Sequence, residues 1–181
     1  MIKLLLLGIP LAGLLLFFYF KLSPSAQLKV GELAPTFSLP DQQGQERRLD
    51  EFKGHWLVLY FYPKDDTPGC TKEACRFRDD YTALQQNGAQ VVGISVDSSA
   101  AHANFAHKHR LPFPLLADTQ GHVAKSYGAL INLGYLKLAK RHTFLIDPAS
   151  RVTKIYLSVD PNTHAKTVFK DMQALKEKAH E

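Results

Sequence analysis

Apolar residues fall into continuous runs separated by stretches with helical spacing, and this pattern predicts a series of strands and helices. Trp56–Tyr62 is nearly continuous and apolar, which is typical of a central strand covered on both faces, and Gln90–Val96 repeats the pattern. Shorter strands are predicted at Thr36–Leu39, Phe113–Ala117, His142–Ile146 and Val152–Ser158. Helices are predicted at Pro68–Gln86, Ser98–His109 and Asn162–Ala179. Strand–helix alternation that ends in a β-hairpin and a helix predicts an α/β sandwich with a mixed central sheet.

The N-terminal segment breaks this pattern. Leu4–Phe20 holds 17 residues without a charge and is followed by Lys21. As a helix it would span about 26 Å, close to the hydrocarbon thickness of a membrane. Removal as a signal peptide would require cleavage after Ala26, and Pro24 then occupies a position where such sites need a small residue. We therefore expect an uncleaved signal anchor rather than a removed signal peptide.

The leader also predicts where the protein resides. The amino terminus and Lys3 on one side nearly balance Lys21 and Lys29 on the other, so the basic residues do not set the orientation. Three residues precede the apolar run, and this short tail suits an anchor whose N-terminus stays in the cytoplasm. We expect residues 27–181, a single domain by length, to be held at the bacterial inner membrane and to face the periplasm. If the leader and linker, assigned to residues 1–26, are cleaved, the domain is expected to be soluble in the periplasm.

Composition and charge narrow the range of functions. The 181 residues carry 22 Lys and Arg against 17 Asp and Glu, a net charge of +5, but basic residues alternate with acidic ones. We therefore expect a solvated surface and no nucleic-acid binding. Two cysteines exclude a disulfide-rich miniprotein and a four-cysteine zinc site. His102, His107 and His109 form no i,i+4 ligand pair, so we expect them to be exposed and expect neither a metal nor a cofactor.

The segment that follows the first long apolar run carries the clearest chemical signal. Thr67 is a good N-cap and Pro68 suits the first helical position, which places Cys70 in the first turn of a helix. Unpaired backbone N–H groups and the positive end of the helix both favour a thiolate there. This arrangement indicates a nucleophilic cysteine.

The same residues carry a family resemblance. The pattern Pro63-x-x-x-Thr67-x-x-Cys70 resembles the active-site signature of the peroxiredoxins, and Cys75 is similar to the resolving cysteine of their bacterioferritin-comigratory (Q-type) branch. The resemblance implies a thioredoxin-like fold, and it covers nearly the whole chain after the leader. Its other matching segments are Pro35–Asp41, Val92–Asp97, Phe113–Asp118 and Arg141–Asp147. The segment Ile131–Lys140 does not follow the family pattern closely.

The resemblance implies a role for each of these residues. Cys70 is expected to be the peroxidatic thiolate, which attacks the peroxide O–O bond and becomes a sulfenic acid. Thr67 would hold the thiolate and the peroxide oxygen, Arg141 would stabilise the thiolate and the departing oxygen, and Pro63 would shield the pocket from water. Cys75 would close an intrachain disulfide with Cys70, which a thioredoxin-like protein would reduce. The substrates would be hydrogen peroxide and organic hydroperoxides, and the protein a monomer or weak dimer.

Helix geometry adds a conformational expectation. If Cys70 and Cys75 share one intact helix, their Cα atoms lie about 8.6 Å apart and the side chains point to different sides. A disulfide usually needs Cα atoms within about 6.8 Å of each other. We therefore expect the first turns, roughly Thr67 to Arg76, to unwind after oxidation, and we expect Gly69 to weaken the helix there.

A second function is compatible with the same cysteines. A membrane-tethered thioredoxin-fold thiol–disulfide exchanger without peroxidase activity would also use two thiols. Its usual mark is Cys-x-x-Cys, whereas Cys70 and Cys75 are separated by four residues.

Three nearby residues have more than one interpretation. Glu73 is expected either to be a surface charge paired with Arg76 or Arg78, or to act in the site. Tyr62 would either line the pocket or pack in the core. Asp118 would cap the following helix and take no catalytic role.

Overall fold

The structure is a computed structural model that describes residues 28–178. The leader Leu4–Phe20 and the predicted domain start at residue 27 therefore lie outside the described residues. Among residues 28–178, no helix is long and apolar enough to cross a membrane.

A five-stranded mixed sheet forms the centre of the domain, as predicted. Its strands lie in the order β5-β4-β3-β8-β9. β3 runs parallel to β4, β4 runs parallel to β5, and β8 is antiparallel to both β3 and β9. The strand bounds are β3 Trp56–Phe61, β4 Ala89–Ser95, β5 Leu115–Ala117, β8 Thr143–Ile146 and β9 Val152–Tyr156.

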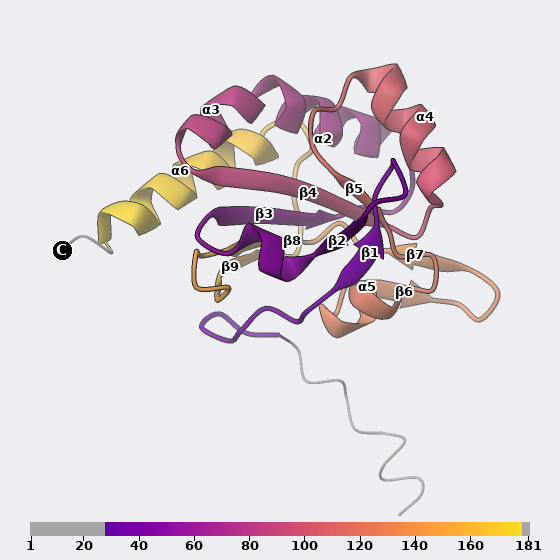
Figure 1. Ribbon diagram of the computed structural model, residues 1–181, viewed down its shortest axis with the longest axis horizontal. Helices are drawn as coiled ribbons and strands as arrows, with labels where there is room; N and C mark the ends of the chain where they lie inside the picture. The colour runs from indigo at the N-terminus through magenta and orange to yellow at the C-terminus, as the bar shows by residue number, and fades with distance from the viewer. Residues whose placement is uncertain (1–27, 179–181) are drawn as a thin grey trace, which may run out of the picture.

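Two layers of different character cover the sheet (Figure 1). One face packs against helices, which are α2 Pro68–Asp79, α3 Tyr81–Gln86, α4 Ser99–His109 and α6 His164–Lys178. The other face is covered mainly by residues 28–37 and short elements, which are β1 Ser38–Pro40, β2 Glu46–Arg48, the 3₁₀ helix η1 Leu49–Phe52, α5 His122–Ser126, β6 Leu130–Asn132 and β7 Lys137–Ala139. Each layer encloses its own buried cluster, so the sheet is buried on both faces.

The apolar run of β3 is explained by these two clusters. Successive side chains of a strand point to opposite faces. Val58 and Tyr60 pack in the cluster under the helices, whereas Leu59 and Phe61 pack in the cluster on the other side. Both faces are dry, so no polar alternation remains in the sequence.

The predicted single helix Pro68–Gln86 is wrong, because the structure has two helices there. α2 ends at Asp79 and α3 begins at Tyr81, with Asp80 at φ −93° and ψ 1° between them. Phe77 of α2 and Leu84 of α3 are both fully buried. A break that keeps the apolar side chains of both helices facing the core leaves the hydrophobic spacing helical, and the pattern therefore did not show it.

The shorter elements of the domain were predicted only in part. A tight turn lies at Asp41–Gly44, where Gly44 N–H donates to the Asp41 carbonyl. The short elements η1, α5 and the β6–β7 hairpin were not predicted, because none is long enough to show a period. Asp118 caps α5 as expected: its Oδ2 accepts a hydrogen bond from Ala124 N–H at 2.7 Å.

Candidate active site

Cys70 lies buried in the first turn of α2, as predicted. Thr67 occupies the N-cap position and Pro68 follows it. The Thr67 hydroxyl makes no capping bond to the helix and donates instead to the Lys64 carbonyl at 3.0 Å. The N-terminal N–H groups of α2 therefore donate no hydrogen bond to the side chain of the capping residue.

Arg141 contacts the thiol from a distant part of the chain. Its Nη2 donates a hydrogen bond to Cys70 Sγ at 3.2 Å across 71 residues of sequence. Arg141 precedes β8, and β8 pairs with β3, whose end leads into α2. The predicted proximity of Arg141 to Cys70 is confirmed, and it follows from this strand pairing.

Gly69 makes room for the guanidinium. A Cβ at this position would lie 3.1 Å from Arg141 Nη2, which is tighter than an ordinary contact. Its φ is not positive, so the glycine is not required by its backbone conformation. We expect Gly69 to favour unwinding of the helix. The close approach of Arg141 is a second reason for a glycine at this position.

Glu73 is a site residue, and its interpretation as a surface charge paired with Arg76 or Arg78 is wrong. It is almost completely buried and forms an ion pair with Arg141 Nη1. Glu73 follows Cys70 by three positions in α2, so the two side chains share a helix face that turns inward. Burial raises the pKa of Glu73 to about 7, although Arg141 opposes the shift. One carboxylate oxygen, Oε1, has no hydrogen-bond partner among the described residues.

A buried hydrogen-bonded cluster holds the loop that precedes α2. Asp65 accepts a hydrogen bond from the Tyr62 hydroxyl at 2.7 Å and pairs with His102 Nδ1 at 2.8 Å. His102 Nε2 lies 3.2 Å from the Leu116 carbonyl. The expectation that His102 is exposed is wrong, because α4 packs this side chain against the loop; Tyr62 is a core residue.

The remaining histidines do not assemble a ligand set. His107 is exposed as expected, whereas His109 is half-buried and lies near Asp66. Within the described part of the chain, no group of three or more His, Cys, Asp or Glu residues is placed to hold a metal ion.

Cys75 lies on the same continuous helix as Cys70, as predicted. Both thiols are free, and Cys75 is half-buried where Cys70 is fully buried. Ideal helix geometry places their Cα atoms about 8.6 Å apart, beyond disulfide range. The structure therefore corresponds to the reduced state.

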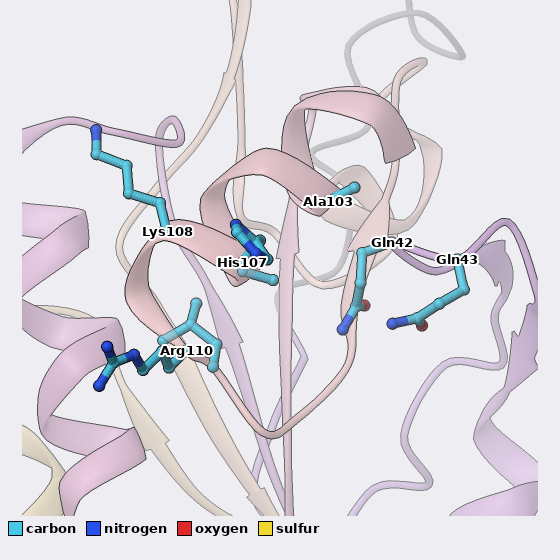
Figure 2. Close-up of a pocket in the computed structure, with 8 residues that line it drawn as sticks. Gln42, Gln43, Ala103, His107, Lys108 and Arg110 are labelled. Atoms are coloured by element: carbon cyan, nitrogen blue, oxygen red, sulfur yellow. The ribbon is translucent and has the colours of Figure 1, made fainter.

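Pro63 and Arg141 line one cavity of about 380 Å³. Ile131 and Ala139 also line it, so the segment that matches the family least contributes to its wall. A larger hollow of about 750 Å³ lies elsewhere, between Gln42 and Gln43 on one side and residues of α4 such as His107 on the other (Figure 2). The smaller cavity adjoins the thiol site through Arg141, which contacts Cys70, although Cys70 itself does not line it. Neither Arg141 nor Pro63 lines the larger hollow, so it is separate from the thiol site.

Cys70 is a buried thiol at a helix N-terminus, and a guanidinium contacts it beside a thioredoxin-like sheet. This combination is typical of the thiol peroxidases. The family model described as the AhpC/TSA family matches residues 30–155. The chain therefore belongs to the AhpC/TSA family, and it is a peroxiredoxin.

Individual relatives define the type more closely. The chain is 43% identical over 152 residues to the chloroplastic peroxiredoxin Q of Sedum lineare, covering 83% of this chain and 81% of that protein. It resembles the crystal structure of peroxidoxin BcpB from Mycobacterium tuberculosis, with a TM-score of 0.78, 39% identity, and coverage of 82% and 98% of the two chains. The bacterioferritin comigratory protein of Xanthomonas campestris gives a TM-score of 0.71 at 32% identity, over 76% of this chain and 90% of that one. The protein is a thiol peroxidase of the Bcp/PrxQ type.

Proposed function

We propose that Cys70 is the peroxidatic residue of this thiol peroxidase. The thiolate attacks one oxygen of the hydroperoxide, the O–O bond breaks, and the products are a Cys70 sulfenic acid and, after protonation, an alcohol or water. The observation that carries this assignment is the hydrogen bond from Arg141 Nη2 to Cys70 Sγ. A permanent cation in that position stabilises both the thiolate and the negative charge on the departing oxygen.

Two further residues shape the peroxide pocket in this proposal. Pro63 lines the cavity with Arg141 and limits the access of water to it. Thr67 lies three residues before Cys70, and its hydroxyl would turn from the Lys64 carbonyl toward the bound peroxide. The reaction needs no metal or cofactor, because the electrons come from the thiols.

Cys75 completes the cycle as the resolving residue. Its thiolate attacks the Cys70 sulfenic acid, an S–S bond forms, and the sulfenic oxygen leaves as water. A thioredoxin-like dithiol protein then reduces the disulfide and is itself oxidised. The intrachain bond requires α2 to unwind first, because an intact helix keeps the two Cα atoms out of range.

The substrate proposal covers hydrogen peroxide and organic hydroperoxides. The Xanthomonas relative is described by an alkyl peroxide reduction activity. The apolar side chains of Ile131, Leu157 and Val159 line the cavity beside Arg141, which suits the alkyl group of such a substrate. We propose a monomer or weak dimer.

We propose that Leu4–Phe20 anchors the domain at the bacterial inner membrane, facing the periplasm. The support is the 17-residue uncharged run and the short segment before it. Fractionation of cells that express the full chain tests this. Membrane-bound protein supports the anchor, soluble periplasmic protein starting near Gln27 indicates cleavage, and soluble cytosolic protein contradicts both.

The cysteine roles are tested by consumption of hydroperoxide under single-turnover and steady-state conditions. Cys70→Ser should abolish both. Cys75→Ser should retain the first turnover and lose recycling by the thioredoxin-like reductant. Loss of the first turnover in Cys75→Ser would contradict the assigned roles. Disulfide exchange without any peroxide consumption by the parent chain would instead favour the thiol–disulfide exchanger.

A further inference from the structure

Exposed apolar side chains are concentrated on one side of the domain. Six large apolar side chains are exposed among residues 28–178, and five of them come from the first described segment or from the turn between β6 and β7. These five are Val30, Leu33, Leu133, Tyr135 and Leu136. Tyr135 is 99% exposed and Leu133 is 61% exposed, so neither is explained by packing within the domain.

The two segments belong to one surface, which we name the leader-side face and define as residues 28–36, α5 and the β6–β7 hairpin. The Tyr127 hydroxyl, next to α5, donates to the Pro35 carbonyl at 2.7 Å. Leu28, Gly128 and Lys140 line a common cavity, so the start of the described chain meets the base of the hairpin. Figure 1 shows both segments on the side of the domain opposite α2, α3 and α4, with the first described residues toward one end of that side and the tip of the β6–β7 hairpin toward the other.

The hairpin tip is a hydrogen-bonded turn. Asn132 Oδ1 accepts a hydrogen bond from Gly134 N–H at 3.1 Å, and Leu133 N–H donates to the Leu136 carbonyl at 2.9 Å. Gly134 has φ +81°, which only glycine adopts without strain. The turn therefore holds Leu133 and Tyr135 outward.

The charge on this face is of one sign over a long segment. Between Thr119 and Lys140 there are three lysines and no Asp or Glu. Lys125 and Lys140 are exposed, and Lys137 follows the hairpin turn. Apolar and aromatic side chains bordered by lysines match the surface of an anionic bilayer, where the rings enter the interfacial region and the ammonium groups meet lipid phosphates.

The chain outside the described residues identifies the bilayer as the occupant. Only seven residues, Lys21–Gln27, connect the apolar run to Leu28, and fully extended they reach about 25 Å. If Leu4–Phe20 lies in a membrane, the face that carries Leu28 is held within that distance of it. We propose that the leader-side face docks on the anionic surface of that membrane, with the β6–β7 tip in the interfacial region; this rests on the proposed membrane anchor.

The surface can be tested without the leader on residues 27–181. A solved relative consists almost entirely of this domain, which indicates that the domain folds alone. Cosedimentation with vesicles of phosphatidylcholine and phosphatidylglycerol (3:1) should show binding, and pure phosphatidylcholine should bind at least tenfold less. The double variant Leu133→Ser/Tyr135→Ser should lose at least tenfold in partitioning, because two apolar contacts with the interface disappear.

Two matched sets of lysine variants test whether vesicle binding depends on the lysines of the leader-side face or only on the net charge of the protein. Replacing Lys125, Lys137 and Lys140 by Gln should weaken vesicle binding by about fivefold per lysine. Replacing the exposed lysines of α6, namely Lys166, Lys170 and Lys178, changes the net charge equally and should have little effect. Thermal unfolding of every variant confirms that it is folded.

The full chain provides a second measurement. In nanodiscs that contain brominated lipid, the tryptophan fluorescence of Tyr135→Trp should be quenched strongly relative to the parent, whose single tryptophan is Trp56. The fluorescence of Asn104→Trp on α4 should not be quenched in this way.

Three results would overturn the proposal: no vesicle binding, equal binding by the serine variant, or no quenching at Tyr135→Trp. So would self-association that the serine variant abolishes, which would make the face a contact between two copies. Peroxidase activity of the parent toward a soluble hydroperoxide reports separately on the proposed function.

Discussion

At the residue scale, the thiol site depends on one guanidinium that contacts two side chains, Cys70 and Glu73. Arg141 Nη2 donates to Cys70 while Nη1 pairs with Glu73. Burial and the opposing charge act against each other at Glu73, whose pKa is raised to about 7 by burial despite the arginine. The fork of Arg141 is what lets a single cation face both groups.

Replacing this arginine by lysine should therefore be damaging although the charge is kept. We expect Arg141→Lys to lower the second-order rate constant with hydrogen peroxide about a hundredfold, because an ammonium cannot hold Glu73 and Cys70 in the same geometry. Stopped-flow measurement of single-turnover oxidation gives this rate. Arg76→Lys, an exposed position on the same helix, is the matched control and should be unchanged. If Arg141→Lys lowers this rate constant less than threefold, the simultaneous contact of the guanidinium with Cys70 and Glu73 is not needed for the reaction.

The Asp65–His102 pair makes a second prediction at this scale. His102→Leu leaves the buried Asp65 carboxylate with the Tyr62 hydroxyl but without the imidazole, and we expect a loss of about 3 kcal/mol in the free energy of unfolding. Asp65→Asn should cost about 1 kcal/mol or less, since an amide accepts from Tyr62 and donates to a neutral His102. Urea unfolding measures both, and exposed His107→Leu is the control. Equal losses in the two variants would show that the charge of Asp65 is unimportant.

At the element scale, α2 must serve two incompatible geometries. Wound from Pro68 to Asp79, it places Cys70 at its N-terminus beside Arg141. The same winding keeps Cys75 out of bonding range. In the proposed mechanism, the wound helix serves the attack on peroxide and the unwound helix serves the formation of the disulfide.

Amide hydrogen exchange should report this change directly. We expect exchange across Thr67–Phe77 to accelerate at least a hundredfold when one equivalent of peroxide oxidises the protein, because the disulfide cannot form on the wound helix. Cys75→Ser, which stops at the sulfenic acid, should keep more of its protection. Protection that persists in a protein with a Cys70–Cys75 bond would contradict the unwinding, and an interchain disulfide would make Cys75 a residue of the dimer contact.

At the scale of the whole molecule, a buried histidine joins the closing helix to the sheet. His164 begins α6, and its Nε2 lies 2.8 Å from the Thr143 hydroxyl of β8. Burial, the larger cause, and the charge of Arg141 together lower the pKa of His164 to about 4, while Asp171 partly opposes the shift. The folded state therefore favours the neutral ring.

This shift makes global stability depend on acidity. The folded pKa lies below the ordinary value of 6.5, so the stability from neutral His164 is present above pH 6.5 and is lost as the pH falls toward 4. The loss amounts to about 3 kcal/mol over that range. Urea unfolding of the parent and of His164→Gln at pH 7 and pH 4.5 isolates this contribution from that of Glu73, which changes in the opposite direction. The same pH dependence in both proteins would exclude His164 as its source.

Much of the fold and of the thiol site could be predicted from the sequence, because the signals are local. A dry strand covered on both faces, such as β3, shows as a continuous apolar run. Thr67 and Pro68 mark a helix start, and the family signature extends the prediction to Arg141. The strand and the helix start depend on neighbours along the chain, whereas Arg141 was carried over from the family signature and reaches Cys70 through the pairing of β8 with β3.

Only the tertiary structure decided which charged and polar residues are buried. His102, expected at the surface, is buried because α4 packs onto the Asp65 loop, and Glu73 is buried because its helix face meets Arg141. The sequence pattern likewise did not predict the break after Asp79 or the outward position of the β6–β7 tip. Burial of a charge depends on a partner supplied by a distant segment, and the pattern of residues along the chain does not contain that pairing.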